Sequence, residues 1–235
     1  MERGRVYLIP SFLAETNNAS HFPPVNLDVV GKLDRFIVEN LRTARRFLRK
    51  VGYTIDFDQV VFYELNKHTD PAQIATYLKD TMDGVDVGLL SEAGIPCIAD
   101  PGSAIVALAH EQGIRVVPLS GPSSIFLALM ASGFNGQQFV FHGYLPIDRR
   151  EKEQKLREME KQAAALGQTQ IFMETPYRNN QLMAAIMRTC KESTLLCIGS
   201  MISHDAFEFI RTKPVGKWKS SLPDLNKKPT VFLLM

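Results

Sequence analysis

Short apolar runs alternate with longer amphipathic segments through the first half of the chain. The β-branched and aromatic runs predict strands at Val6–Ile9, Phe36–Val38, Val60–Leu65, Val85–Leu90 and Arg115–Leu119. Helical periodicity between and after these runs predicts helices at Leu41–Lys50, Pro71–Met82, Ser103–Gln112 and Ser123–Ala131. Strands that alternate with helices imply crossover connections, so this half predicts a mostly parallel sheet.

The pattern changes after Phe139–Phe141. A long charged segment and a shorter amphipathic one predict helices at Arg149–Lys161 and Arg178–Arg188. Four further runs predict strands at Thr169–Met173, Thr194–Met201, Ala206–Arg211 and Thr230–Leu234. This half therefore predicts a mixed sheet. A strand gives way to Gly121-Pro122 between the two patterns, and we expect two α/β domains, residues 1–119 and 120–235.

Composition favours a folded protein without a membrane span. The chain has 235 residues, of which 45% are hydrophobic and 22% charged, as is usual for a packed protein. Its longest apolar stretches are much shorter than the roughly 20 residues of a spanning helix, and its first residues lack a signal-peptide pattern, so we expect a cytoplasmic protein. The net charge of +2 says little about partners.

Cysteines and histidines do not predict a metal site or disulfides. Cys97, Cys190 and Cys197 are odd in number and match neither a disulfide framework nor zinc-ligand spacing, so we interpret them as incidental or buried thiols. His21 and the pair His204-Asp205 have no partners at metal-ligand spacing, and we predict no metal site.

The most informative segment, Ser91–Gly102, follows a predicted strand and precedes a predicted helix. Ligands of open parallel sheets bind at the carboxyl ends of the strands. Small residues here let a ligand approach the backbone, and Glu92 offers a carboxylate to an amine or hydroxyl. The alternative is a plain strand–loop–helix connection. In the later segment Pro118–Ser124, the hydroxyls either cap the next helix or bind a ligand, and capping is the favoured interpretation.

Together these segments resemble the tetrapyrrole methylase superfamily. Ser-Glu-Ala-Gly-Ile-Pro-Cys-Ile-Ala-Asp-Pro-Gly at 91–102 is followed by Gly-Ile-Arg-Val-Val-Pro-Leu-Ser-Gly-Pro-Ser-Ser at 113–124. Within the superfamily, the segments resemble the branch of small-subunit ribosomal RNA cytidine 2'-O-ribose methyltransferases. Three later motifs match that branch in order, at Gly143–Pro146, Phe172–Arg178 and Phe207–Arg211.

The first 80 residues depart from the branch. The loop Ile9–Glu15 keeps the family's proline and lacks its glycine, and Glu39-Asn40-Leu41-Arg42 stands where the family has Glu-Asp-Thr-Arg.

The resemblance implies that S-adenosylmethionine (SAM) binds in a cleft between two α/β domains, and that the protein is a homodimer. Carried over residue by residue, the implied cofactor contacts are Pro10, Glu92, Ala93, Gly94, Ile95, Ser123, Ser124, Met173 and Glu174. The sequence contains no Gly-x-Gly-x-x-Gly fingerprint, so a dinucleotide-dependent dehydrogenase lacks support.

Glu39 and His68 are the candidate catalytic residues, because a hydroxyl acceptor of the methyl group benefits from a general base. Each follows a predicted strand. The competing interpretations are a capping role for Glu39 and an ordinary surface loop for His68.

Basic residues suggest where an RNA acceptor would bind. Arg42, Arg45, Arg46 and Arg49 recur at spacings of three and four, which places them on one helix face suited to RNA phosphates. The alternative is a solvated helix face. In Arg149–Lys161 the charges of both signs interleave, which favours a solvated helix.

The resemblance thus implies an SAM-dependent methyltransferase acting on the ribose 2'-hydroxyl of ribosomal RNA. Two alternatives stay open. One is a C-methyltransferase of a porphyrin or corrin ring, which the altered loop Pro10–Glu15 would accommodate. The other is a catalytically silent SAM-binding protein, suggested by the missing glycine and by Asn40.

Overall fold

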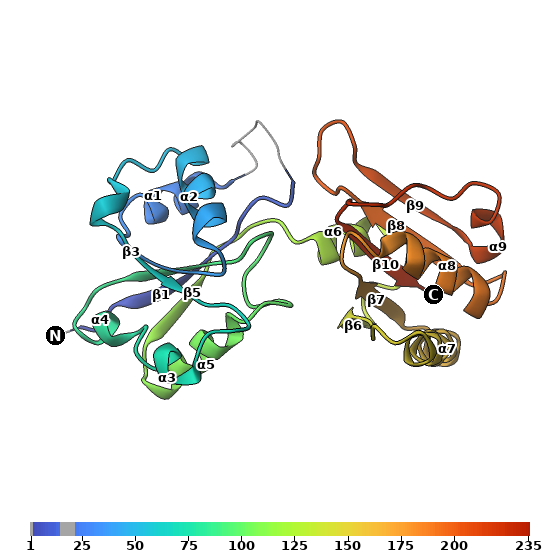
Figure 1. Ribbon diagram of the computed structural model, residues 1–235, viewed down its shortest axis with the longest axis horizontal. Coiled ribbons are helices and arrows are strands. Elements are labelled where there is room, and N and C mark those ends of the chain that lie inside the picture. Colours follow the sequence, from blue (N-terminus) through green and yellow to red (C-terminus); the bar gives the residue numbers. More distant parts are fainter. Residues whose placement is uncertain (1, 15–21) are drawn as a thin grey trace. The chain divides into compact units, whose positions relative to one another are not determined.

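The computed structural model describes residues 2–14 and 22–235, so Glu15 and His21 of the segments discussed above lie outside the described residues. The chain forms two compact units, Met1–Pro122 and Ser123–Met235, each built on its own five-stranded sheet (Figure 1). The predicted fold class is confirmed: both units are α/β, the first with a parallel sheet and the second with a mixed sheet.

The sheet of the first unit is entirely parallel, with strand order β3-β2-β4-β1-β5. Its strands are β1 (Arg5–Ile9), β2 (Arg35–Val38), β3 (Val61–Glu64), β4 (Val87–Leu90) and β5 (Arg115–Pro118). The central strand β4 is buried along its whole length. Within it, a Cβ on Gly88 would lie 2.6 Å from Ile9 Cδ1 and 2.9 Å from Phe36 Cδ1, so glycine lets the neighbouring strands pack closely.

Helices connect these strands. They are α1 (Pro24–Val30), α2 (Leu41–Lys50), the 3₁₀ turn η2 (Phe57–Gln59), α3 (Pro71–Ile74), α4 (Lys79–Met82) and α5 (Ser103–Glu111). Two apolar clusters fill the unit, one centred on Phe36 and Leu48 and the other on Ile37 and Leu78.

The prediction of one helix over Pro71–Met82 is wrong, because the segment breaks into α3 and α4. Its start is as predicted, with Asp70 accepting a hydrogen bond from the Ala72 amide. The Thr76 hydroxyl donates to the Gln73 carbonyl at 2.7 Å and competes with helical bonding. The buried Tyr77 hydroxyl donates to the Glu64 carbonyl at 2.7 Å, which fixes the break against β3.

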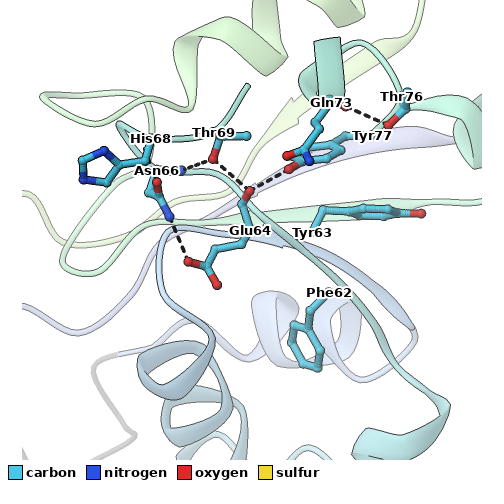
Figure 2. A pocket seen from close by; sticks show the side chains of 9 residues that line it. All are labelled: Phe62, Tyr63, Glu64, Asn66, His68, Thr69, Gln73, Thr76 and Tyr77. Atoms are coloured by element: carbon cyan, nitrogen blue, oxygen red, sulfur yellow. Dashed lines mark hydrogen bonds between the residues drawn. The ribbon is translucent and has the colours of Figure 1, made fainter. Parts of the chain in front are cut away.

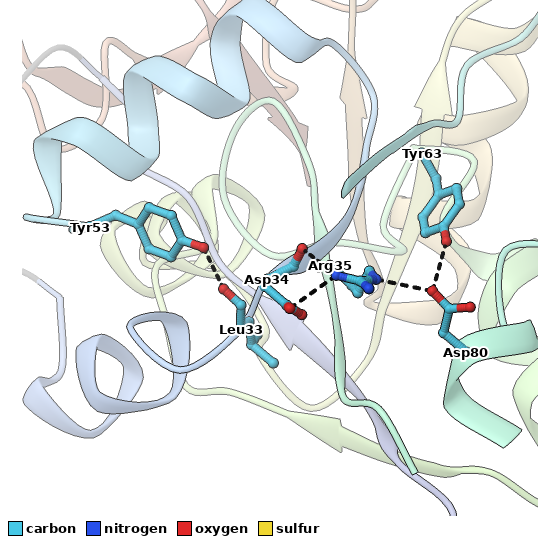
Figure 3. A network of polar contacts seen from close by, with 6 residues as sticks. All are labelled: Leu33, Asp34, Arg35, Tyr53, Tyr63 and Asp80. Atoms are coloured by element: carbon cyan, nitrogen blue, oxygen red, sulfur yellow. Dashed lines mark hydrogen bonds and ion pairs between the residues drawn. The ribbon is translucent and has the colours of Figure 1, made fainter. Parts of the chain in front are cut away.

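An ionic network lies at the amino end of β2 (Figure 3). The Arg35 guanidinium pairs with Asp34 and with Asp80 of α4, each at 3.0 Å, and the Tyr63 hydroxyl donates to Asp80 at 3.2 Å. The Tyr53 hydroxyl donates to the Leu33 carbonyl beside it. The network ties β2, β3 and α4 together at the end of β2 opposite the candidate site.

The sheet of the second unit has strand order β6-β7-β10-β8-β9. Only β6 and β7 pair in parallel, and the other pairs are antiparallel. The strands are β6 (Phe139–Tyr144), β7 (Thr169–Met173), β8 (Leu195–Ser200), β9 (Phe209–Pro214) and β10 (Thr230–Leu234). The strand predicted at Ala206–Arg211 begins at Phe209, three residues later than expected. The preceding residues form a turn instead, in which the amides of Ala206 and Phe207 donate to His204 Nδ1.

The helices of this unit are α6 (Ser124–Ser132), α7 (Arg149–Leu166), α8 (Asn179–Thr189) and the short α9 (Val215–Trp218). Helix α7 contains the charged segment Arg149–Lys161, and its interpretation as a solvated helix holds for only part of its surface. One side of α7 buries Lys152, Leu156, Met159 and Ala163. The core also holds Trp218, whose indole donates to the Leu196 carbonyl at 3.1 Å.

The thiols are chemically quiet. Cys190 and Cys197 are buried, Cys97 is half-buried, and all three are free. Burial raises the pKa of Cys97 and of Cys190 to about 12. Within the described part of the chain, no helix combines the length and apolarity that crossing a bilayer requires.

Candidate functional site

Two loops at the carboxyl edge of the first sheet are bonded to each other. The Ser11 amide donates to the Gly94 carbonyl at 2.8 Å, and the Gly94 amide donates back to Ser11 at 3.2 Å. The Ser11 hydroxyl also donates to the Ser91 carbonyl at 3.1 Å. The loop after β1, which carries Pro10, is thus joined to the loop after β4, which carries Glu92–Ile95.

Two glycines allow the loop after β5 to join this arrangement. Gly94 has φ +76°, and a Cβ there would lie 2.9 Å from Leu13 Cδ2 and 3.2 Å from the Pro122 carbonyl oxygen. A Cβ on Gly121 would lie 2.2 Å from Pro10 Cβ. Larger residues would push these loops apart, so packing requires both glycines, and the backbone conformation also favours glycine at Gly94.

The remainder of the β4 loop is folded around Asp100. Its Oδ1 accepts hydrogen bonds from the amides of Cys97 at 3.0 Å and Gly102 at 2.7 Å. Cys97 and Ala99 have φ of +70° and +64°, the left-handed region that non-glycine residues rarely adopt. Such backbone costs of order 1–3 kcal/mol per residue and persists where the surroundings hold it. Asp100 Oδ2 is buried and has no hydrogen-bond partner within the described residues.

Three carboxylates gather at this edge of the sheet. Glu39, directly after β2, is half-buried, and a small cavity of about 10 Å³ is lined by Glu39, Asp100, Ser91 and Gly102 among others. That volume is about the space one water molecule needs. Burial raises the pKa of Glu39, the negative charges of Glu92 and Asp100 raise it further, and the main-chain amide of Glu92 offsets part of the rise. Glu39 is therefore a better proton acceptor than an exposed glutamate.

The start of α2 is connected to the same loops. Asn40 caps the helix, accepting the Thr43 amide at 3.1 Å. The Thr43 hydroxyl lies 3.3 Å from Glu92 Oε1, within hydrogen-bond distance of it. The capping role considered for Glu39 thus falls to Asn40.

The arginine face of α2 differs from a simply solvated one. Arg42 and Arg46 are exposed, whereas the Arg45 guanidinium lies 5.6 Å from the Phe57 ring centre and 5.4 Å from that of Phe62. Arg49 lies 5.3 Å from the same Phe57 ring. Cation–π contacts of this kind hold the guanidinium groups in place. Sequence spacing did not identify the two phenylalanines, because their contact with α2 depends on the fold.

His68 does not line the cavity of Glu39. It is exposed in the loop after β3 and lines a separate, open pocket of about 590 Å³ (Figure 2). The two candidate bases therefore line different cavities.

In the second unit, Glu174 directly follows β7 and its side chain is fully buried. Its carboxylate accepts hydrogen bonds from Lys152 at 3.2 Å, Arg178 at 2.6 Å and the Thr175 amide at 2.8 Å. Burial alone would raise the pKa of Glu174, but the bonds from Arg178, Thr175 and Lys152 outweigh it and lower the pKa. The carboxylate is committed to this network, so any ligand contact falls to the main chain of Glu174.

The other predicted cofactor residues of this unit lie at element ends. Met173 is the half-buried last residue of β7. Ser123 stands at the N-cap of α6 and Ser124 is the first helical residue. The favoured capping interpretation is wrong for Ser123, whose hydroxyl makes no capping hydrogen bond. Ser123 is a buried residue, 8% exposed, and its hydroxyl is left for another partner.

Metal-ligating residues do not cluster: residues 2–14 and 22–235 contain no group of three or more His, Cys, Asp or Glu side chains placed to hold a metal ion.

Comparison with known proteins shows the family of the chain. Residues 25–211 match the family described as Tetrapyrrole (Corrin/Porphyrin) Methylases. The chain belongs to this family. A solved structure of similar fold, described as the crystal structure of the methyltransferase CobJ, matches with a TM-score of 0.63 over 98% of this chain and 93% of that one. At 14% identity this likeness concerns the fold alone.

Curated relatives of the tetrapyrrole methylase chain carry the name ribosomal RNA small subunit methyltransferase I. The protein from Vibrio cholerae is 30% identical over 74% of this chain, and that from Escherichia coli O157:H7 is 28% identical over 92%. The protein from Bacillus subtilis is 30% identical over 79%. The matched segments span 56%, 71% and 59% of these relatives' own lengths, respectively.

Proposed function

We propose that this protein is an SAM-dependent methyltransferase that methylates a ribose 2'-hydroxyl of small-subunit ribosomal RNA. The observation that carries the proposal is the half-buried Glu39 at the edge where the loops after β1, β4 and β5 are joined, in a chain of the tetrapyrrole methylase family. The names of the curated relatives support ribosomal RNA as the acceptor.

The residues of the first unit fit a cationic cofactor. SAM carries a sulfonium and an ammonium, and Glu39, Glu92 and Asp100 supply negative charge at this edge. We propose that Pro10 and Glu92–Ile95 hold the cofactor here. In the second unit, Ser123, Ser124, Met173 and the main chain of Glu174 remain the proposed contacts.

When bound, SAM supplies an already activated methyl group, so the protein mainly aligns the acceptor and excludes water. Glu39 is proposed to accept the proton of the 2'-hydroxyl on a carboxylate oxygen as the oxygen–methyl bond forms. A general base works best when its pKa lies near the operating pH, and the raised pKa of Glu39 is a shift in that direction.

A polar arginine face favours RNA over a macrocycle as the acceptor. Arg42 and Arg46 are exposed and point to no carboxylate partner within the described residues, so they are available to phosphates. A porphyrin-like ring would need a broad apolar surface instead. Because rRNA is the proposed acceptor, we also propose that the protein acts in the cytoplasm, and the family resemblance suggests a homodimer.

Calorimetric titration with SAM tests the cofactor assignment. Binding in the micromolar range corresponds to about −8 kcal/mol. We expect the Glu92→Ala, Gly94→Trp variant to lose it, because a bulky side chain at Gly94 collides with Leu13 and the Pro122 carbonyl. Folded protein that does not bind SAM would contradict the proposal.

The acceptor assignment is tested with Arg42→Glu, Arg46→Glu. These exposed arginines are preferable to Arg45 and Arg49, whose loss would also disturb the contacts with Phe57. We expect weaker RNA binding and a shallower dependence of affinity on salt, with SAM binding unchanged. RNA binding that is absent or insensitive to salt in the unmodified protein would refute this part.

A further inference from the structure

A cluster of aromatic rings lies under the arginine face of α2. The Phe57 ring stacks on Tyr53, with ring centres 6.1 Å apart and an angle of 17° between the planes. It also meets Phe62 edge to face at 6.0 Å. Phe62 stacks in turn on the fully buried Phe36, with ring centres 5.9 Å apart. The half-buried Phe57 ring is therefore anchored to the core of the first unit.

Two arginines of α2 lie over this cluster. The Arg45 guanidinium lies 5.6 Å from the centre of the Phe57 ring and 5.4 Å from that of Phe62, and Arg49 lies 5.3 Å from the centre of Phe57. Neither guanidinium has a hydrogen bond or an ion pair with residues 2–14 and 22–235, and Arg45 Nε is buried without a partner. Aromatic rings, rather than carboxylates, thus hold both cations, and their charge is not neutralised.

Arg49 is open to a further flat group. Arg45 is half-buried, whereas Arg49 is exposed, with the Phe57 ring beneath it and solvent beyond it. The exposed Arg42 and Arg46 precede it at spacings that form one stripe along α2. A stripe of cations that ends in a planar, ring-supported guanidinium suits a nucleic-acid strand whose bases are free to stack.

We propose that Arg49, supported by Phe57, is a platform on which an unpaired base of the RNA acceptor stacks. The identity of the ligand as RNA rests on the proposed function. Guanidinium planes and aromatic rings are the groups on which splayed-out bases of single-stranded RNA stack. Every base has a π-face, so the platform accepts any of the four bases.

The stacked base is distinct from the nucleotide that would be methylated. Helix α2 begins at Leu41, two residues after Glu39, and Arg49 lies in its last turn. At the helical rise per residue, Arg49 is about 12 Å from Leu41 along the axis. A ribose at Glu39 and a base on Arg49 therefore belong to different nucleotides, and the platform holds a segment that flanks the acceptor.

The test uses a 12-mer of uridines in which one 2-aminopurine, a base whose fluorescence falls when it stacks, is moved through the strand. Anisotropy of a terminal fluorescein gives the affinity for the full-length protein. We expect wild type to quench 2-aminopurine at one or more positions. Arg49→Lys keeps the charge and loses the planar group. It should abolish the quenching and weaken binding about fivefold, the lower end of the range for one stacked base.

The dependence of affinity on salt separates stacking from charge. Arg49→Lys should leave its slope unchanged, because the number of cations that meet phosphates stays the same. Phe57→Leu, which keeps an apolar side chain and removes the ring, should also lose the quenching at an unchanged slope. Arg115→Lys is the matched control, because Arg115 is exposed at the start of β5 and contacts no aromatic ring among the described residues. It should keep the wild-type quenching, affinity and slope.

The outcomes distinguish the platform from the proposed function. RNA binding by wild type without quenching at any position would overturn the platform and leave the RNA acceptor in place. Quenching by Arg49→Lys equal to that of wild type would do the same. The absence of any anisotropy change with wild type would overturn both the platform and the RNA acceptor, while calorimetry with SAM on the same samples still tests the cofactor assignment by itself.

Discussion

Glu39 and Glu174 occupy equivalent places in the two units, since each directly follows a buried strand. Their surroundings are opposite. Glu174 is held by Lys152, Arg178 and a main-chain amide, and its pKa is lowered. Glu39 faces the carboxylates of Glu92 and Asp100, and its pKa is raised. The position after a strand thus supplies a carboxylate, and its neighbours determine whether the carboxylate stabilises the fold or accepts a proton.

Replacement of Glu39 should give the largest effect on activity. We expect Glu39→Gln to lower kcat of methyl transfer by about 10²–10⁴-fold, the contribution typical of a general base. Thermal stability should change little, because Glu39 makes no ion pair among the described residues. SAM affinity should fall by much less than kcat, because Glu92 and Asp100 still supply negative charge at this edge. Single-turnover assays with radiolabelled SAM measure the rate. A Glu39→Gln variant with wild-type kcat would remove Glu39 from the reaction.

Replacement of Glu174 should instead affect folding. Glu174→Gln leaves Lys152, whose side chain is 8% exposed, without its counter-charge. Breaking a buried pair by removing one partner costs about 3–5 kcal/mol. We expect that loss in the free energy of unfolding measured by urea denaturation at pH 7. The exposed Glu151→Gln on the same helix as Lys152 serves as control and should stay within about 0.5 kcal/mol of wild type.

The dependence of this loss on pH has a definite sign. The pKa of Glu174 is lower in the folded protein than its ordinary value of 4.5, so its stabilisation is fully present above that pH. It is lost as the pH falls through the folded-state pKa. The difference between wild type and Glu174→Gln should therefore shrink below pH 4.5. A difference that stays constant down to acid unfolding would mean that the network does not depend on the charge of Glu174.

Sequence reasoning identified most strands and helices because their apolar residues recur with clear periods. The parallel sheet followed from alternation, and α2 was predicted with its observed bounds. Short elements were missed: α1 has an exposed Val25 and no acidic first turn, and α9 has only four residues. The break between α3 and α4 was missed because the Tyr77 hydroxyl bonds to β3, a contact remote in sequence.

The candidate site was predictable only where loops follow strands. Pro10 and Glu92–Ile95 were chosen by family resemblance, and the hydrogen bonds between Ser11 and Gly94 bring them together. The ion pair between Glu174 and Lys152 could not be predicted from the sequence, because the charge pattern around Lys152 is that of a solvated helix. Asp100 was given no role of its own in the motif at 91–102, although its Oδ2 is buried and its charge acts on Glu39.

The smallest effect is expected from Asp100, whose charge contributes to the difference in pKa between Glu39 and Glu174. Asp100→Asn keeps an Oδ1 acceptor for the amides of Cys97 and Gly102 while removing the charge that faces Glu39. The pKa of Glu39 should fall, so the acid limb of the profile of kcat/KM against pH should move to lower pH. Asp58→Asn, at an exposed aspartate in η2, should leave the limb in place. If Asp100 only shapes its loop, stability will drop and the limb will not move; a shifted limb with unchanged SAM affinity identifies the charge as the tuning element.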